Sequence, residues 1–188
     1  MRKSTATEIV ARRLGVARGR ADSLVQRAAE DNLLPTADGS RRYPPDLGPA
    51  EMANLLLAVA VDKGLAVTGH TVRELAGLTA ATGHTLGDAL TGLFRDGAAL
   101  QASVTGSLVI RLEPASASMT LGGTHMRYGP EPPPDSAGRH VIVPGRTLAA
   151  IGLEFGGRSP DDANTIVALA TASRALDLSA AFSNVGST

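Results

Sequence analysis

The sequence predicts an α+β fold in which helices come first and β-hairpins follow, with a final helix at the end. Apolar residues recur at helical spacing through most of the chain up to residue 97. Alternating runs broken by glycines follow after that point, which is typical of short strands. Ser159 and Asp162 have the spacing of a helix cap, which indicates the start of the final helix.

The N-terminal stretch predicts two short helices joined at Gly15. Apolar side chains of the first helix, up to Leu14, fall on one stripe, Ala11 is small enough for a close crossing, and Gly15 suits a turn that needs a positive φ. Thr5 and Glu8 have the spacing of a capping box. The second helix, at about 17–32, carries a buried side with these residues: Ala21, Leu24, Val25, Ala28 and Ala29.

Two helices joined in this way have the layout of a helix-turn-helix. From Gly15-Val16 to Asn32-Leu33-Leu34 the register resembles winged helix-turn-helix regulators of the MerR and GntR types. The stretch that continues it, 38–43 with the sequence DGSRRY, looks like the wing of MerR-type regulators. The resemblance covers about the first quarter of the chain, and it implies a DNA-binding domain over residues 1–48.

Charge supports the same hypothesis. The whole chain has a formal net charge of zero, from 18 Lys and Arg against 18 Asp and Glu. Residues 1–45 hold nine Lys or Arg and five Asp or Glu, a balance of 9 − 5 = +4. The basic excess therefore coincides with the predicted helix-turn-helix and favours double-stranded DNA as its partner.

If this domain binds DNA, helix 17–32 enters the major groove, where all base pairs can be distinguished. Arg18 and Arg20 near its beginning are expected to reach guanine edges, and three residues lie farther along it: Ser23, Gln26 and Arg27. Arg12 and Arg13 at the end of the first helix are expected at phosphates. Arg41 and Arg42 in the wing are expected against the DNA backbone or in the minor groove. Tyr43 is expected as a phosphate donor or as an anchor of the wing in the core.

Residues 49–113 predict a helical middle domain. A helix from Pro49 is apolar over most of its circumference, so it packs beneath the first two helices or lies in a subunit interface. Two further helices flank Gly83, and the runs 98–105 and 107–113 resemble a hairpin separated at Gly106. This order fits a second, degenerate winged helix that contacts DNA, or a scaffold or oligomerisation domain.

Residues 114–188 predict a β-rich region of unknown role. A hairpin turns at Gly122-Gly123, a proline-rich stretch covers 129–138, and a strand covers 140–143. Residues 146–155 fit either a helix or a strand, and the final helix is expected to reach about Leu176. This region is a possible surface for a protein partner.

Composition excludes several kinds of site. The chain has no cysteine, and its four histidines are dispersed, so we expect no metal, no cofactor and no catalytic residue. The paired glycines lack the context of a phosphate loop, and no serine lies in a nucleophile elbow. No apolar run is long enough to span a bilayer. We therefore expect a cytoplasmic protein that is not an enzyme and has no membrane partner.

Three functions remain open on this basis. The leading hypothesis is a sequence-specific transcriptional regulator from a bacterium or phage, which binds DNA as a homodimer or higher homo-oligomer. The order of the segments also resembles phage terminase small subunits, which recognise DNA for packaging. The third is an adaptor or inhibitor whose winged helix binds protein.

Overall fold

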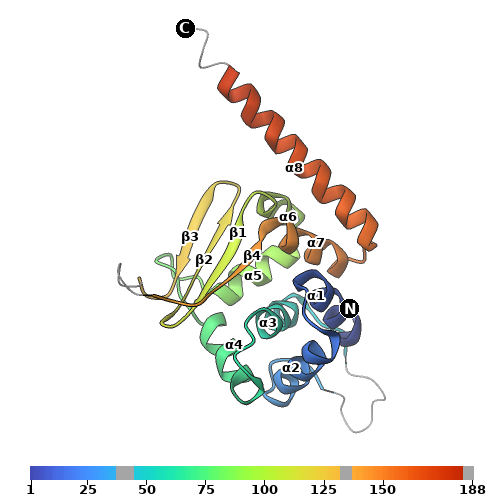
Figure 1. Cartoon of the computed structure of the whole chain (residues 1–188), viewed down its shortest axis with the longest axis vertical. Coiled ribbons are helices and arrows are strands. Elements are labelled where there is room, and N and C mark those ends of the chain that lie inside the picture. The colour runs from blue at the N-terminus through green and yellow to red at the C-terminus, as the bar shows by residue number, and fades with distance from the viewer. Residues whose placement is uncertain (37–44, 132–136, 184–188) are drawn as a thin grey trace.

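A computed structural model of the chain describes residues 1–36, 45–131 and 137–183, with the backbone alone described for 175–183 (Figure 1). Within these ranges the fold is α+β, with eight α-helices and one four-stranded antiparallel sheet. Helices gather around one face of the sheet, and the last helix packs on the body through its first part and then extends away from it. None of the described helices combines the length and apolar character needed to cross a membrane.

The chain begins with two helices that form a hairpin, α1 (Lys3–Leu14) and α2 (Arg18–Glu30). The predicted turn is confirmed, because Gly15 ends α1 with φ 67° and Val16 N–H donates to the Ala11 carbonyl at 2.9 Å. The predicted capping box at Thr5 is wrong. Helix α1 starts earlier, at Lys3, so Thr5 already lies inside the helix.

Helix α3 (Pro49–Ala60) is the centre of the fold. Leu55, Leu56 and Leu57 are all fully buried, although three consecutive residues point to different sides of a helix. This is possible because α3 packs against α1 and α2 on one side and against α4 and α5 on the other. Of the two expected roles for this apolar helix, the structure shows packing beneath the first two helices.

The next helices are α4 (Thr68–Ala76), preceded by the 3-10 turn η1 (Leu65–Val67), then α5 (Leu86–Arg95) and α6 (Gly97–Ser103). Of these, α4 and α5 cover the other side of α3, and α6 packs against α5 and against the later helix α7 (Gly145–Phe155). The turn predicted at Gly83 is confirmed, with φ 86°. The strand predicted over 98–105 is wrong. The Asp96 carboxylate accepts a hydrogen bond from Ala98 N–H at 2.9 Å and caps a short helix there.

The sheet has the strand order β3-β2-β1-β4. Its strands are β1 (Ser107–Leu112), β2 (Ala115–Leu121), β3 (Thr124–Tyr128) and β4 (His140–Pro144). The hairpin predicted at Gly122-Gly123 is confirmed, and both glycines have positive φ. One face is apolar and packs under the helices; it carries Leu108, Ile110, Met119, Tyr128 and Val143, none more than 1% exposed.

Two helices follow β4, namely α7 (Gly145–Phe155) and α8 (Pro160–Ser183). The segment that fitted either a helix or a strand is therefore a helix. The predicted cap of the last helix is confirmed, because Ser159 Oγ accepts from Asp162 N–H at 3.2 Å and donates to the Asp162 carboxylate. Helix α8 runs beyond the expected Leu176 as far as Ser183.

The three segments predicted as domains share one hydrophobic core. The main cluster of buried residues contains Val25 from α2, Leu56 from α3, Leu90 from α5, Ile110 from β1 and Ile151 from α7. Segments before residue 49 and after residue 113 thus pack into the same interior. The domain boundaries themselves stay a prediction.

Since α3 is enclosed by four helices, Leu56→Ala should destabilise the protein by about 2–5 kcal/mol, because little around the new cavity can collapse into it. Urea unfolding followed by circular dichroism measures the loss. Ile142→Ala is the matched control, since Ile142 lies on the open side of the sheet and is 64% exposed. Equal effects of the two substitutions would contradict the central position of α3.

Candidate nucleic-acid interface

The α1–α2 hairpin has one buried and one exposed side, as the sequence predicted. Ala21, Leu24 and Val25 of α2 lie inside, while Ser23 and Gln26 are exposed on the opposite side of the helix. The periodicity of apolar residues fixes which side of α2 faces the core. The exposed side is the candidate surface for DNA.

Arg18, at the start of α2, is held by carboxylates of the hairpin itself. Its Nε lies 3.0 Å from both carboxylate oxygens of Asp22, and Nη1 lies 3.5 Å from Glu8. Nη2 also donates to the Ser4 carbonyl at 3.0 Å. The Arg18 side chain is 41% exposed, so these contacts lie on the surface.

The later part of α2 shows the same pattern. Arg27 pairs with Glu30 at 3.1 Å and with Asp31 at 3.6 Å. Gln26 donates to the Glu30 carboxylate at 3.3 Å, and Ser23 Oγ donates to the Gly19 carbonyl at 2.9 Å. These polar side chains thus pair mostly within the helix, although Arg27 Nε is buried without a hydrogen-bond partner among the described residues.

Arg20 has a structural contact beyond the hairpin. Its guanidinium donates two parallel hydrogen bonds of 2.6 Å to the Asp62 carboxylate, just after α3. The hydrogen bond from Arg20 is the largest influence on Asp62 and holds the pKa of this carboxyl below its usual value of 3.8, and Gly64 N–H adds to the effect. Arg20 therefore fixes α2 to the end of α3.

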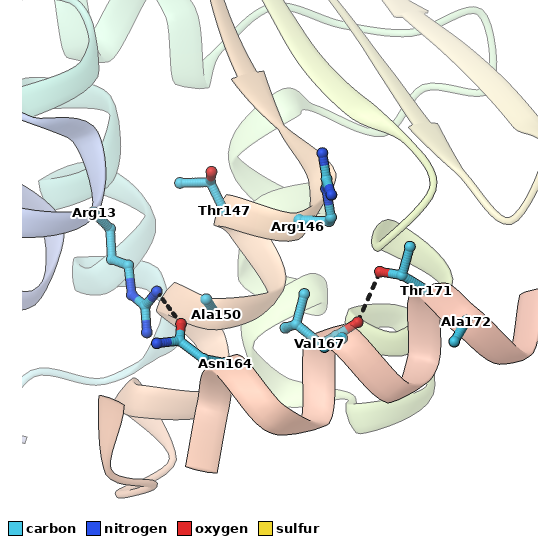
Figure 2. A pocket seen from close by; sticks show the side chains of 9 residues that line it. Arg13, Arg146, Thr147, Ala150, Asn164, Val167, Thr171 and Ala172 are labelled. Atoms are coloured by element: carbon cyan, nitrogen blue, oxygen red, sulfur yellow. Dashed lines mark hydrogen bonds between the residues drawn. The ribbon is translucent and has the colours of Figure 1, made fainter. Parts of the chain in front are cut away.

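Arg12 and Arg13 converge on one buried carboxylate. Glu154 of α7 is only 3% exposed, and both guanidiniums bind it, Arg12 through Nη2 and Arg13 through Nε at 2.6 Å. Arg13 also donates to Asn164 Oδ1 of α8 at 2.6 Å (Figure 2). This cluster joins α1 to the last two helices. Both arginines that the sequence places at DNA phosphates thus lie in a tertiary contact.

Three predicted contacts lie outside the described residues. They are the wing residues Arg41, Arg42 and Tyr43. The seven other predicted DNA contacts all lie on α1 or α2, and the five arginines among them are all ion-paired. Carboxylates that are close in space therefore offset the positive charge of these arginines. Two of them, Asp62 and Glu154, come from parts of the chain that are distant in sequence.

Sequence reasoning missed Glu154 and Asp62 as partners. One signal was present, because Glu154 is the single charged residue in the otherwise apolar stretch 148–155. A carboxylate that is buried with such a helix requires a cationic partner. No comparable signal marked Asp62, whose pairing depends on how α3 crosses α2.

A groove opens beside the Arg13–Asn164 contact, between α7 and α8 (Figure 2). Its volume is about 610 Å³, and Ala150, Val167 and Thr171 line it together with Arg13 and Arg146. Arg146 has no ion pair among the described residues. The described lining of the groove holds guanidinium, hydroxyl, amide and apolar groups, and neither a carboxylate nor a histidine.

The remaining shifted groups have structural causes. The hydrogen bonds from Thr85 that cap α5 lower the pKa of Asp88, and burial raises the pKa of Tyr128. Among the described residues, no group of three His, Cys, Asp or Glu could hold a metal ion.

Comparisons of this chain with protein-family models, with curated proteins and with solved structures find no match. The arguments for its function therefore come from its own residues and their arrangement. The contact of Glu154 with Arg12 and Arg13 and the contact of Arg20 with Asp62 each lead to a prediction about stability.

Replacing Glu154 by Gln removes the charge that Arg12 and Arg13 share. We expect a loss of about 1–3 kcal/mol, below the full cost of breaking a buried pair because Arg12 stays partly solvated. Urea unfolding measures it, with Glu74→Gln on the exposed side of α4 as the control, for which a change of about 0.5 kcal/mol or less is expected. Indistinguishable unfolding curves for the two variants would refute a structural role for this cluster.

The Arg20–Asp62 contact should make stability depend on pH. Because the folded state lowers the pKa of Asp62, the contact stabilises the protein above pH 3.8 and loses this effect as the pH falls through the lower value of the folded state. Asp62→Asn should therefore be less stable than the wild type at pH 7, and the difference should shrink below pH 3.8. Thermal unfolding across this range tests it; a constant difference would exclude the linkage.

Proposed function

We propose that this chain is a DNA-binding protein of the transcription-regulator class, which acts as a homo-oligomer and uses α1–α2 as its helix-turn-helix. The observation that carries the proposal is how α2 is packed and which of its side chains are exposed. The helix follows α1 across a glycine turn, buries its inner side against α3, and leaves Arg18, Ser23 and Gln26 exposed. Exposed polar side chains on a firmly packed helix are what a major groove accepts.

The ion pairs on α2 allow this role. Exposed pairs such as Arg18–Asp22 contribute only about 0–1 kcal/mol, so a DNA phosphate can replace the carboxylate at little cost. Arg12, Arg13 and Arg20 are needed for tertiary contacts, and the burial of Glu154 makes the release of Arg12 and Arg13 costly. In this proposal DNA contact therefore depends on Arg18 and Arg27, together with the wing residues that the sequence indicates.

The acidic residues of α2 favour a second candidate, the protein-binding adaptor. Asp22, Glu30 and Asp31 lie beside the arginines of the exposed side and offset their charge. DNA repels such carboxylates, whereas a protein surface of mixed charge can pair with both signs. The two candidates differ in whether the protein binds duplex DNA at low salt.

The direct test is a salt titration of binding to random duplex DNA, measured by fluorescence anisotropy. Arg18→Ala/Arg27→Ala removes two phosphate contacts and should weaken binding and flatten the slope of log K against log salt by about 1.8. Arg41→Ala/Arg42→Ala should act similarly if the wing contributes. Arg95→Ala/Arg127→Ala is the matched control, since it removes two exposed arginines from α5 and β3.

The proposal requires the control to bind like the wild type. Failure of the intact protein to bind DNA at low salt would refute DNA binding and leave the adaptor as the better candidate. Equal slopes for the α2 variant and the wild type would show that DNA contacts another surface.

A further inference from the structure

The face of the sheet that is turned away from the helices contains a small polar cavity, here called the sheet hollow. Side chains alternate between the two faces along each strand, so Val109 of β1 and Ser116 and Ser118 of β2 lie on this face. These middle strands carry small side chains, whereas the edge strands β3 and β4 carry His125 and His140. The difference in size leaves a hollow of about 170 Å³ between the edges.

The chemistry of the sheet hollow is one-sided. Its described lining contains hydroxyl, imidazole and guanidinium groups, and none of these residues is acidic. Hydroxyls and imidazoles can donate hydrogen bonds, and a guanidinium can only donate them. The hollow therefore suits a group that is rich in hydrogen-bond acceptors.

Ser116 is the residue that most clearly lacks a partner. It is only 6% exposed, yet its hydroxyl makes no hydrogen bond to any described residue. The hydroxyl of Ser118, two residues along the same strand, also has no partner among them. Buried hydroxyls in folded proteins are almost always hydrogen-bonded, to protein, water or ligand. Both side chains line the hollow, so their hydrogen bonds are left for a molecule inside it.

His125 is held so that one ring nitrogen stays available. Thr120 Oγ1 lies 3.0 Å from Nδ1 of this histidine. When the threonine hydroxyl donates to Nδ1, the proton of the neutral ring is on Nε2, which can then donate. The β3 edge of the sheet hollow thus offers a further hydrogen-bond donor.

Arg111 brings a fixed positive group to the floor of the sheet hollow. It is 6% exposed, and its guanidinium donates to the carbonyls of Glu113 and Ala137 at 3.1 and 2.9 Å. A guanidinium beside hydroxyl donors favours an oxyanion. Arg127 also lines the hollow, but it pairs with Glu131, and we assign it no contact.

We propose that the sheet hollow binds a phosphate group, either inorganic phosphate or the terminal phosphate of a monoester. Ser116 and Ser118 donate to its oxygens from the floor, and His125 donates from the β3 edge. Pockets that enclose a drug-sized molecule measure about 300–1,000 Å³, so this hollow holds the phosphate alone and leaves any organic part outside. The inference goes beyond the proposed function and does not rest on it.

Titration with inorganic phosphate, followed by backbone amide shifts in NMR spectra, tests this site. The largest shifts are expected on β2 between Ser116 and Ser118, and at His125. Ser116→Ala/Ser118→Ala should weaken binding at least tenfold, because it removes two hydrogen bonds to a charged group. Ser107→Ala is the matched control, since Ser107 lies on the same face of β1 but outside the hollow, and it should bind like the wild type.

Thermal unfolding separates binding from a role in the fold. Without phosphate, Ser116→Ala/Ser118→Ala should melt at the temperature of the wild type or above it, because the two hydroxyls have no partner to lose. Added phosphate should raise the melting temperature of the wild type and of Ser107→Ala, but not that of the double variant. A double variant that melts earlier without phosphate would show that the hydroxyls serve the fold, and would overturn the proposal.

Phenyl phosphate separates the two sources of the group. A site for monoesters should bind it at least as tightly as inorganic phosphate, whereas a site for free phosphate should bind it at least tenfold more weakly. Sodium chloride at the same ionic strength should cause none of the shifts. Equal shifts with chloride, shifts centred away from β2, or unchanged binding in the double variant would overturn the proposal. These tests contain no DNA, so their failure would leave the role of α2 unaffected.

Discussion

The structure depends on the complete burial of α3. Its leucines at 55, 56 and 57 point to different sides and are all enclosed, so α1, α2, α4 and α5 must each take a fixed place around it. This constraint sets the crossing of α1 and α2, and with it the side of α2 that meets solvent. The position of Arg20 beside Asp62, directly after α3, follows from the same packing.

The buried carboxylate of Glu154 is the second constraint. It binds Arg12 and Arg13 and so connects the N-terminal hairpin with α7, the first of the two C-terminal helices. A basic residue near a helix-turn-helix is easily taken for a phosphate contact, but here the cation neutralises a charge that the fold has buried. The proposed contact with DNA therefore uses fewer arginines than the number of basic residues in 1–45 suggests.

Local signals predicted much of the fold, and long-range contacts explain the rest. Gly15, Pro49 and the Ser159 cap mark their helices because their effects act within a few residues. The strand expected over 98–105 was wrong because the Asp96 cap outweighed a weak alternation of apolar residues. At the candidate site, the sequence identified the exposed side of α2. It could not show that three arginines predicted to contact DNA bind carboxylates instead: Arg12 and Arg13 bind Glu154, and Arg20 binds Asp62.

The central claim is that the exposed side of α2 is the surface that meets DNA. Backbone amide shifts in NMR spectra, recorded while duplex DNA is added at low salt, test it most directly. The account predicts that the largest changes occur on α2 between Arg18 and Arg27, with little change at the open face of the sheet around His125 and Arg127. Changes centred on the sheet, or none on α2, would contradict it.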